Sequence, residues 1–347
     1  MERAKHHGSR ALDVGGARGS PGRPQCTVSS VLGSSAGLGP VNENRRRSTG
    51  HEGPVERVSV DVCVVTYNSG RTFPQLVASV EAYMPQGTRI LVRDNSPKPG
   101  LLDDLERRVS SGVEIHVVGQ GDNVGFGRAC NELASASDRP WILFLNPDAE
   151  LLTPLPSTVG ADPLCMIGPL VESPSGQTEA TFGPDRSMWF ELKQRVLRTR
   201  VRLDPDRPID FVSGACFAIS RERFLGLGGF DDRYFMYYED IDLGRRWRGR
   251  GGQILIERGW RVRHIGGASA NAAPLTALVR SYQSACRYHQ RWHVVPQTFK
   301  AICVVEAALK LTLALIAGRV GKVDRNTQWG LFKYVIASPW NRVLADD

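Results

Sequence analysis

From residue 58 onward, short runs of β-branched and aliphatic residues alternate with amphipathic segments. The apolar runs predict strands at 58–65, 89–93, 113–118 and 141–145. The intervening segments at 71–84, 100–109 and 125–136 predict helices. Because short apolar strands that alternate with helices are typical of βαβ units, the expected fold class is α/β, with a mostly parallel central sheet flanked by helices.

The pattern becomes less regular after residue 150. Residues 178–208 are charged, contain prolines and show no clean period, so we expect a mobile flap there. Further strands are predicted at 211–219, 253–256 and 260–264, with a helix at 240–249. Helices are expected from about residue 274 to the end of the chain.

Composition divides the chain into three parts. Residues 1–56 are rich in Gly, Ser, Pro and Arg and lack the apolar core of a secretory signal, so they predict a disordered basic extension. Residues 57–272 predict a globular α/β domain, and 273–347 a C-terminal helical region. The most apolar stretch, 299–318, carries Lys300, Glu306 and Lys310. It predicts either a helix lying in the headgroup plane of a membrane or one packed on the domain.

Charge and cysteine usage narrow the class of partner. The net charge of +8 favours anionic partners, but no basic motif interleaved with aromatic residues and no zinc-finger spacing occurs, so nucleic acid is the least favoured. The seven cysteines include no C-x-x-C pair. Because Cys63, Cys130, Cys216 and Cys303 lie in apolar runs, we expect reduced, structural thiols in a cytosolic compartment.

Polar residues follow each of the first four predicted strands, at 66–68, 94–95, 122–123 and 146–148. In parallel α/β sheets, ligands bind at the carboxyl ends of the strands. Two acidic residues, Glu239 and Asp240, follow an aromatic run. Burying a carboxylate even partly costs free energy unless the group is paired or bound to a metal. These features predict a metal-assisted reaction with a separate general base. The alternative for this acidic segment is a simple surface ion pair between Asp242 and Arg246, one helical turn away.

Seven segments in this order resemble family 2 glycosyltransferases of the GT-A fold. They are V-V-T-Y-N-S (64–69), D-N-S (94–96), G-D-N-V-G-F-G-R-A-C-N (121–131), F-L-N-P-D (144–148), S-G-A-C-F-A-I (213–219), G-G-F-D-D-R-Y-F-M-Y-Y-E-D-I-D-L (228–243) and H-I-G-G-A-S (264–269). The resemblance covers roughly residues 58–295. Within the family, the combination is most like actinobacterial rhamnosyltransferases acting on polyprenyl-diphosphate-linked N-acetylglucosamine. It implies a GT-A catalytic domain of the nucleotide-diphospho-sugar transferase type over 57–272.

The resemblance implies a donor site at the strand ends. Asp94 would accept a hydrogen bond from the N3–H of thymine or uracil, although an ordinary turn residue is the alternative at this position. Asn123 and Gly125 open a helix whose amide end would lie near the donor phosphates or sugar. The implied donor-binding residues are Thr66, Tyr67, Asn68, Asp94, Asn95, Asn123, Gly125 and Asn146.

The resemblance also implies a metal. Residues 146–148 take the place of the family's D-x-D motif, with Asn146 in the first position. Asp148 is therefore the expected ligand of Mg²⁺ or Mn²⁺, while the donor diphosphate supplies further oxygens. His264 matches a family position that can complete the metal shell, and a purely structural histidine is the alternative.

The same resemblance makes Asp240 the general base for the acceptor hydroxyl in an inverting transfer. Glu239 would orient acceptor or sugar hydroxyls, and Gly214 and Tyr237 would lie on the acceptor side. The aromatic residues of 234–238 either line the sugar site or pack in the core.

The expected activity is inverting, metal-dependent transfer of L-rhamnose from dTDP-rhamnose to a lipid-linked or polysaccharide acceptor in cell-wall or cell-surface glycan synthesis. One alternative is a transferase that uses UDP-hexose or UDP-galactofuranose, because no residue of the base site distinguishes thymine from uracil. A second alternative is a catalytically inactive nucleotide-sugar-binding protein. A third alternative is a nucleotidyltransferase, although that activity calls for a Gly-rich basic loop, which residues 66–71 match only poorly. We expect a cytoplasmic location at the inner face of the plasma membrane, and the oligomeric state stays open.

Overall fold

A computed structural model describes residues 58–97, 113–199, 204–265, 274–293, 295, 297–320 and 323–338. The predicted disordered extension over 1–56 and the helix predicted at 100–109 lie outside these ranges. All described residues belong to one compact unit.

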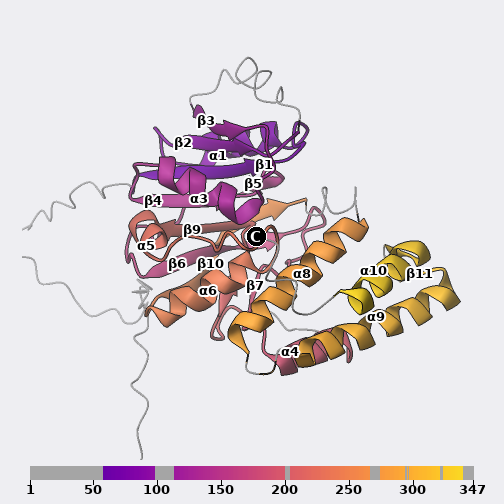
Figure 1. The fold of residues 1–347 in the computed structure, drawn as a ribbon. Coiled ribbons are helices and arrows are strands. Elements are labelled where there is room, and N and C mark those ends of the chain that lie inside the picture. The colour runs from indigo at the N-terminus through magenta and orange to yellow at the C-terminus, as the bar shows by residue number, and fades with distance from the viewer. Residues whose placement is uncertain are drawn as a thin grey trace, which may run out of the picture. The chain divides into compact units, whose positions relative to one another are not determined.

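Eight strands form the central sheet in the order β3-β2-β1-β4-β9-β6-β10-β5 (Figure 1). They are β1 (Val60–Thr66), β2 (Arg89–Asp94), β3 (Glu114–Gln120), β4 (Trp141–Leu145), β5 (Ala149–Leu151), β6 (Cys165–Glu172), β9 (Cys216–Ser220) and β10 (Gln253–His264). Neighbours pair in parallel except at β4–β9, β9–β6 and β10–β5. The predicted α/β class is confirmed, with a sheet that is parallel through its first four strands and mixed beyond them.

Helices flank this sheet and continue beyond it. They are α1 (Phe73–Tyr83), α3 (Phe126–Ala136), α4 (Met188–Arg195), α5 (Arg221–Gly226), α6 (Glu239–Gly249), α8 (Pro274–Trp292), α9 (Gln297–Ala317) and α10 (Arg325–Ala337). Two short ribbons pair β7 (Phe182–Gly183) with β8 (Phe211–Val212) and β11 (Arg319–Val320) with β12 (Val323–Asp324). None of the helices in the described ranges has the length and hydrophobicity that crossing a bilayer requires.

Three sequence-based predictions differ from the structure. The strand predicted at 211–219 is split into β8 and β9, because the backbone at 213–215 bonds other elements: Ser213 donates to Thr181 and Ala215 accepts from Asn146. The two strands predicted at 253–256 and 260–264 are one bulged strand, β10. The segment predicted as a flap contains helix α4, which was not predicted from the sequence because this segment has no hydrophobic period. Its N-cap is Ser187, whose side chain accepts from the Phe190 amide.

Two of the hydrophobic clusters in the described residues support the site region. The first lies between the sheet and helices α3, α5 and α6, with Phe144 and Phe230 near its centre. The second packs α8, α9 and α10 against the segment 234–241. Tyr234 and Tyr238 belong to this second core, so much of the aromatic run is core packing rather than a wall of an open site. The C-terminal helices thus support the segment that carries the predicted base.

Candidate active site

The predicted polar groups gather at one edge of the sheet. Thr66 and Asp94 are register partners at the carboxyl ends of the parallel strands β1 and β2, and β4 ends beside them at Leu145. His264, the last residue of β10, pairs with Ala149 at the start of β5. The strand topology therefore brings the motifs at 66–68, 94–95, 146–148 and 264 to a common edge.

Asp94 has one satisfied and one open carboxylate oxygen. The side chain is fully buried. Its Oδ1 accepts three hydrogen bonds, from Thr66 Oγ1 (2.9 Å), Ser96 Oγ (2.6 Å) and the Ser96 amide (3.0 Å). Its Oδ2 has no partner within the described part of the chain. The Ser96 amide bond is ordinary turn chemistry, but a buried acceptor without a donor is costly, and this one can receive an N–H from a ligand.

The neighbours of Asp94 in the predicted base site differ in their settings. Thr66 is buried, and its hydroxyl donates to Asp94, so it positions that carboxylate. Tyr67 is 40% exposed. Asn68 adopts a left-handed backbone (φ 54°), and its amide donates to Ser96 Oγ over 2.8 Å. Of these three residues, Tyr67 and Asn68 are exposed and can present their side chains to a ligand, whereas Thr66 acts through Asp94.

Asn95 and Gly125 connect the base site to the segment before α6. Asn95 Nδ2 donates to the Gly125 carbonyl (3.1 Å), whereas its buried Oδ1 has no described partner. Gly125 has φ +89°, and a Cβ at this position would lie 2.6 Å from the Phe235 oxygen, so no larger residue fits. Its backbone amide donates to Asn123 Oδ1 (3.2 Å). Asn95 thereby offers a second open acceptor close to Asp94.

Asp148 and His264 face each other at the neighbouring strand ends. His264 Nδ1 lies 3.1 Å from Glu179 Oε2, and His264 Nε2 lies 3.2 Å from Asp148 Oδ1. Burial alone would lower the pKa of His264, but the carboxylates of Asp148 and Glu179 outweigh it and raise that pKa. The Asn146 amide nitrogen lies 3.4 Å from His264 Nε2.

This pair fits a divalent cation. Glu179 and Asp148 each place a hydrogen-bond acceptor at one ring nitrogen, so a doubly protonated ring suits both, in line with the raised pKa of His264. When the ring is neutral and keeps its proton on Nδ1 toward Glu179, Nε2 presents a lone pair on the Asp148 side. Two electron-pair donors that face each other need a cation or a second proton between them. No cluster of three or more such side chains occurs in the described ranges, and the oxygens of a bound diphosphate are of the type that could add ligands here.

Glu239 and Asp240 form the first turn of α6 behind a strained backbone. Tyr237 and Tyr238 both have left-handed φ angles, of 71° and 65°, which are unfavourable for bulky residues. Asp240 Oδ2 accepts from the Gly214 amide (3.2 Å) and Oδ1 from the Ile241 amide (2.8 Å). Glu239 is 6% exposed, and its Oε2 has no described partner.

Both carboxylates hold their protons more tightly than usual. Burial raises the pKa of Glu239 well above its ordinary value, and the neighbouring Asp240 raises it further. Burial also raises the pKa of Asp240, although the Gly214 and Ile241 amides and the Arg186 guanidinium partly oppose this effect. Perturbed carboxylates of this kind are frequent at catalytic sites.

Gly214 lies between the segment 146–148 and Asp240. Its amide donates to Asp240, while the neighbouring Ala215 carbonyl accepts from the Asn146 amide (2.9 Å). A side chain at position 214 would collide with the Phe126 ring, 2.7 Å from the position of a Cβ. Gly214 therefore owes its place to close packing, and one backbone turn links the Asn146 end of the site to the Asp240 end.

The alternative prediction of a surface ion pair between Asp242 and Arg246 is wrong, because the pair forms but is buried. Arg246 Nε does bond Asp242 Oδ2 (2.6 Å), but Asp242 is fully buried and also accepts from the Trp292 indole (2.8 Å). This carboxylate ties α6 to α8 and is structural. Glu239 and Asp240, the other two acids of the motif, form no ion pair in the described residues and remain the candidates for a catalytic role.

Sequence reasoning missed four residues of this region. Glu179 orients His264, Arg186 opposes the raised pKa of Asp240, Glu191 holds the Tyr238 hydroxyl, and Arg280 lies 4.2 Å above the Phe235 ring. Glu179, Arg186 and Glu191 all lie in the segment 178–208, which has no hydrophobic period, and no local signal marks Arg280.

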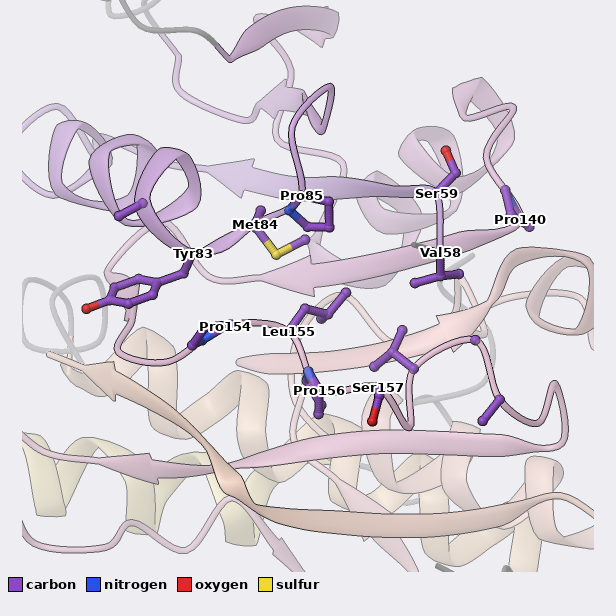
Figure 2. A pocket seen from close by; sticks show the side chains of 14 residues that line it. Val58, Ser59, Tyr83, Met84, Pro85, Pro140, Pro154, Leu155, Pro156 and Ser157 are labelled. Carbon is purple, nitrogen blue, oxygen red and sulfur yellow. The ribbon is translucent and has the colours of Figure 1, made fainter. Parts of the chain in front are cut away.

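A cavity of about 930 Å³ lies away from these residues (Figure 2). It is lined by Val58 and Ser59 before β1, by Pro140 before β4, and by the end of α1 and the loop 154–161. Because β1 and β4 are parallel, this cavity lies at the amino-terminal edge of the sheet, opposite the site.

The chain is similar in sequence to known glycosyltransferases. Residues 61–225 match the family model described as glycosyl transferase family 2. N-acetylglucosaminyl-diphospho-decaprenol L-rhamnosyltransferase of Mycobacterium tuberculosis, from strains CDC 1551 / Oshkosh and ATCC 25618 / H37Rv, is 26% identical over 271 residues. That alignment covers 68% of this chain and 86% of the relative.

Solved structures share the fold. The crystal structure of GalNAc-T7 with UDP, GalNAc and Mn²⁺ superposes with a TM-score of 0.51 at 17% identity, over 84% of this chain but only 58% of that one. Mannosyltransferase PcManGT from Pyrobaculum calidifontis, in complex with GDP-Man and Mn²⁺, gives 0.50 at 15% identity, over 84% of this chain and 88% of that one. The resemblance drawn from the motifs is confirmed: the chain is a glycosyltransferase that carries a family 2 domain of the GT-A fold.

Proposed function

We propose that this chain transfers a sugar from a nucleotide-diphosphate donor to a hydroxyl of a polyprenyl-diphosphate-linked acceptor, with inversion at the anomeric carbon. The favoured donor is dTDP-L-rhamnose. One observation carries the proposal: the buried, open acceptor at Asp94 is linked to the segment before the acidic pair Glu239–Asp240. The link runs from Asn95 to the Gly125 carbonyl and from the Phe126 amide to the Phe235 carbonyl. The name of the mycobacterial relative supports the sugar and the acceptor class.

Asp94 selects the base in this proposal. Its open Oδ2 would accept the N3–H that thymine and uracil carry and that cytosine lacks, and the open Oδ1 of Asn95 offers a second acceptor. Tyr67, exposed beside them, would pack on the nucleoside. Because thymine and uracil share the N3–H edge, a UDP-hexose or UDP-galactofuranose donor is the alternative within the same chemistry.

Asp148 and His264 would hold a divalent cation, with Glu179 fixing the histidine ring. Such a cation, Mg²⁺ or Mn²⁺, would neutralise charge on the donor diphosphate. With Asn146 in place of a second acid, the protein contributes one carboxylate there, so the affinity for the free cation should be modest. The Mn²⁺ in the GalNAc-T7 and PcManGT structures supports divalent metal use.

Asp240 acts as the general base. As the acceptor oxygen bonds to the anomeric carbon, the bond from that carbon to the diphosphate oxygen breaks and the hydroxyl proton moves to the Asp240 carboxylate. The Gly214 and Ile241 amides hold this carboxylate in place, and its raised pKa makes it a stronger base. A positioned base contributes about 10²–10⁴-fold. Glu239, buried beside it, orients the hydroxyls, and Tyr237 lies on the acceptor side.

The experiment is a donor and acceptor panel. The purified protein is incubated with dTDP-rhamnose, UDP-galactofuranose and UDP-hexoses, each with and without a short-chain polyprenyl-diphospho-N-acetylglucosamine, and nucleotide release and product are followed by mass spectrometry. Acceptor-dependent release of dTDP with a rhamnosylated product is the expected result. Donor binding without product from any pair would indicate an inactive nucleotide-sugar-binding protein instead.

A further inference from the structure

Helix α9 is apolar on two opposite faces, and the protein covers only one of them. The buried face consists of Phe299, Cys303, Ala307, Leu311 and Ala314. The opposite face carries Val305, Leu309 and Ile316, which are 47%, 46% and 79% exposed, flanked by Leu313 and Leu315. The spacing of 305, 309 and 316 places these side chains along one line of the helix. Thr312 lies on the same line, and its hydroxyl donates to the Ala308 carbonyl within the helix (3.0 Å).

The charged residues of α9 lie away from the exposed face. Glu306 accepts from Arg195 (2.9 Å) on α4 and from Lys310 (2.6 Å), and Lys300 donates to the Ser338 carbonyl (2.9 Å). Three charged residues within about twenty positions would make a transmembrane span over 299–318 costly. In the structure, protein groups satisfy all three, so the exposed line from 305 to 316 is uncharged.

Helix α10 runs alongside α9 and adds aromatic and basic groups (Figure 1). Its Trp329 is 48% exposed, stacks on Phe332 and has the Lys333 ammonium 5.7 Å from its ring. Arg325 is also exposed. The carboxylates in the described parts of 297–338 are Glu306, which is paired, and Asp324, which accepts from the Thr327 amide and caps α10.

We propose that the exposed face of α9, together with Trp329 and Lys333 of α10, docks on an anionic phospholipid bilayer and lies in the headgroup plane. Aliphatic side chains would enter the acyl boundary, the indole would sit among the headgroups, and the basic side chains would meet lipid phosphates. Aliphatic side chains gathered on one exposed face of a helix, with an aromatic and basic side chains nearby, are typical of a surface that lies in a membrane interface. A second copy of the chain fits less well, because it would bring two net basic surfaces together.

Helix α8 connects this face to the candidate active site. Arg280 lies over Phe235, and Ser284 donates to the Met236 carbonyl (2.7 Å), so α8 packs on the segment before Glu239. At the other end of α8, the His289 ring stacks on Phe299 of α9 with centroids 4.1 Å apart. Docking would bring the candidate active site to a lipid-linked acceptor, and this role rests on the proposed function. The proposal that the surface binds a bilayer does not depend on that function.

Vesicle flotation tests the surface. Full-length protein is mixed at low salt with vesicles of phosphatidylcholine and phosphatidylglycerol, and in parallel with phosphatidylcholine alone. Wild type should float with the anionic vesicles and less with the neutral ones, and Leu309→Glu/Ile316→Glu should stay at the bottom. Leu164→Glu is the matched control, an exposed leucine just before β6 that should float like wild type. Equal flotation of the double variant and wild type would overturn the proposal.

Two further measurements separate the alternatives. Light scattering without vesicles reports the oligomeric state: a wild-type dimer that Leu309→Glu/Ile316→Glu converts to a monomer, with no vesicle binding by wild type, would mean that a second copy covers α9 and would overturn the proposal. Transfer to a water-soluble, short-chain acceptor should be equal in wild type and the double variant, which also shows that the variant folds. Flotation without any transfer would leave the surface standing and reject the proposed function.

Discussion

The hydroxyl of Tyr238 donates a hydrogen bond to Glu191 Oε1 across 3.0 Å, joining the backbone turn before the acidic pair to a buried ion network. Arg195 bonds both partners, reaching the Tyr238 oxygen at 3.1 Å and Glu191 Oε2 at 2.5 Å. A left-handed backbone at a bulky residue costs about 1–3 kcal/mol and persists only when its surroundings hold it. We conclude that α4 holds Tyr238, and therefore the start of α6, in place.

Replacing Tyr238 with Phe should lower turnover more than it changes donor affinity. The variant keeps the ring but removes the hydroxyl that ties the strained turn to Glu191, so Glu239 and Asp240 lose part of their positioning. The measurement compares kcat with the Kd for the donor. Tyr334→Phe is the control, since its hydroxyl accepts from Gln283 at the surface of the C-terminal helices. Unchanged kcat in Tyr238→Phe would show that the tie is not needed.

Asp94→Asn should weaken binding of the donor nucleotide by roughly tenfold or more, corresponding to the loss of about 1–3 kcal/mol when a buried polar contact is spoiled. The amide nitrogen would replace one acceptor oxygen with a donor, next to a ligand N–H. Calorimetry with dTDP gives the Kd. Asp206→Asn, in an exposed pair with Arg258, serves as control and should bind normally. Equal affinity in both variants would exclude Asp94 from the base site.

Asp148→Ala should abolish transfer with the fold intact, and excess EDTA should do the same to wild type. The reason is that Asp148 supplies the carboxylate opposite His264 Nε2. Mn²⁺ binding in the presence of dTDP, followed by electron paramagnetic resonance, should be lost in the variant and retained in Asp206→Asn. Full activity in excess EDTA would contradict the metal assignment.

Glu239→Gln should remove a pH dependence of stability. Burial and Asp240 raise the pKa of Glu239 in the folded state, so the folded protein holds this proton more tightly than the unfolded chain. The stability of wild type should therefore fall as the pH rises above the unfolded value of about 4.3 toward the raised folded value. Melting temperatures of both proteins across this range should show Glu239→Gln gaining on wild type as the pH rises. Parallel curves would contradict the raised pKa.

Local sequence signals predicted much of the fold and part of the site. The β-branched and aliphatic runs of β1, β2 and β4 carry their own strand signal, and the common position of the polar residues after them follows from parallel topology. The contact of Glu179 with His264 joins residues 85 positions apart, and no local pattern specifies it. The insertion of antiparallel β9 depends on its partners β4 and β6. The left-handed angles of Tyr237 and Tyr238 arise from tertiary packing, as does the choice of which face of α9 is covered.

The most direct test of the catalytic proposal is Asp240→Asn, which preserves size and keeps one oxygen to accept a backbone amide, but cannot accept the acceptor proton. Single-turnover transfer of rhamnose from dTDP-rhamnose to the lipid-linked acceptor is measured beside the Kd for the donor, with Asp206→Asn as the matched control. We predict a nearly unchanged Kd and a turnover lower by roughly 10²-fold or more. Turnover of Asp240→Asn near the wild-type rate would contradict Asp240 as the base.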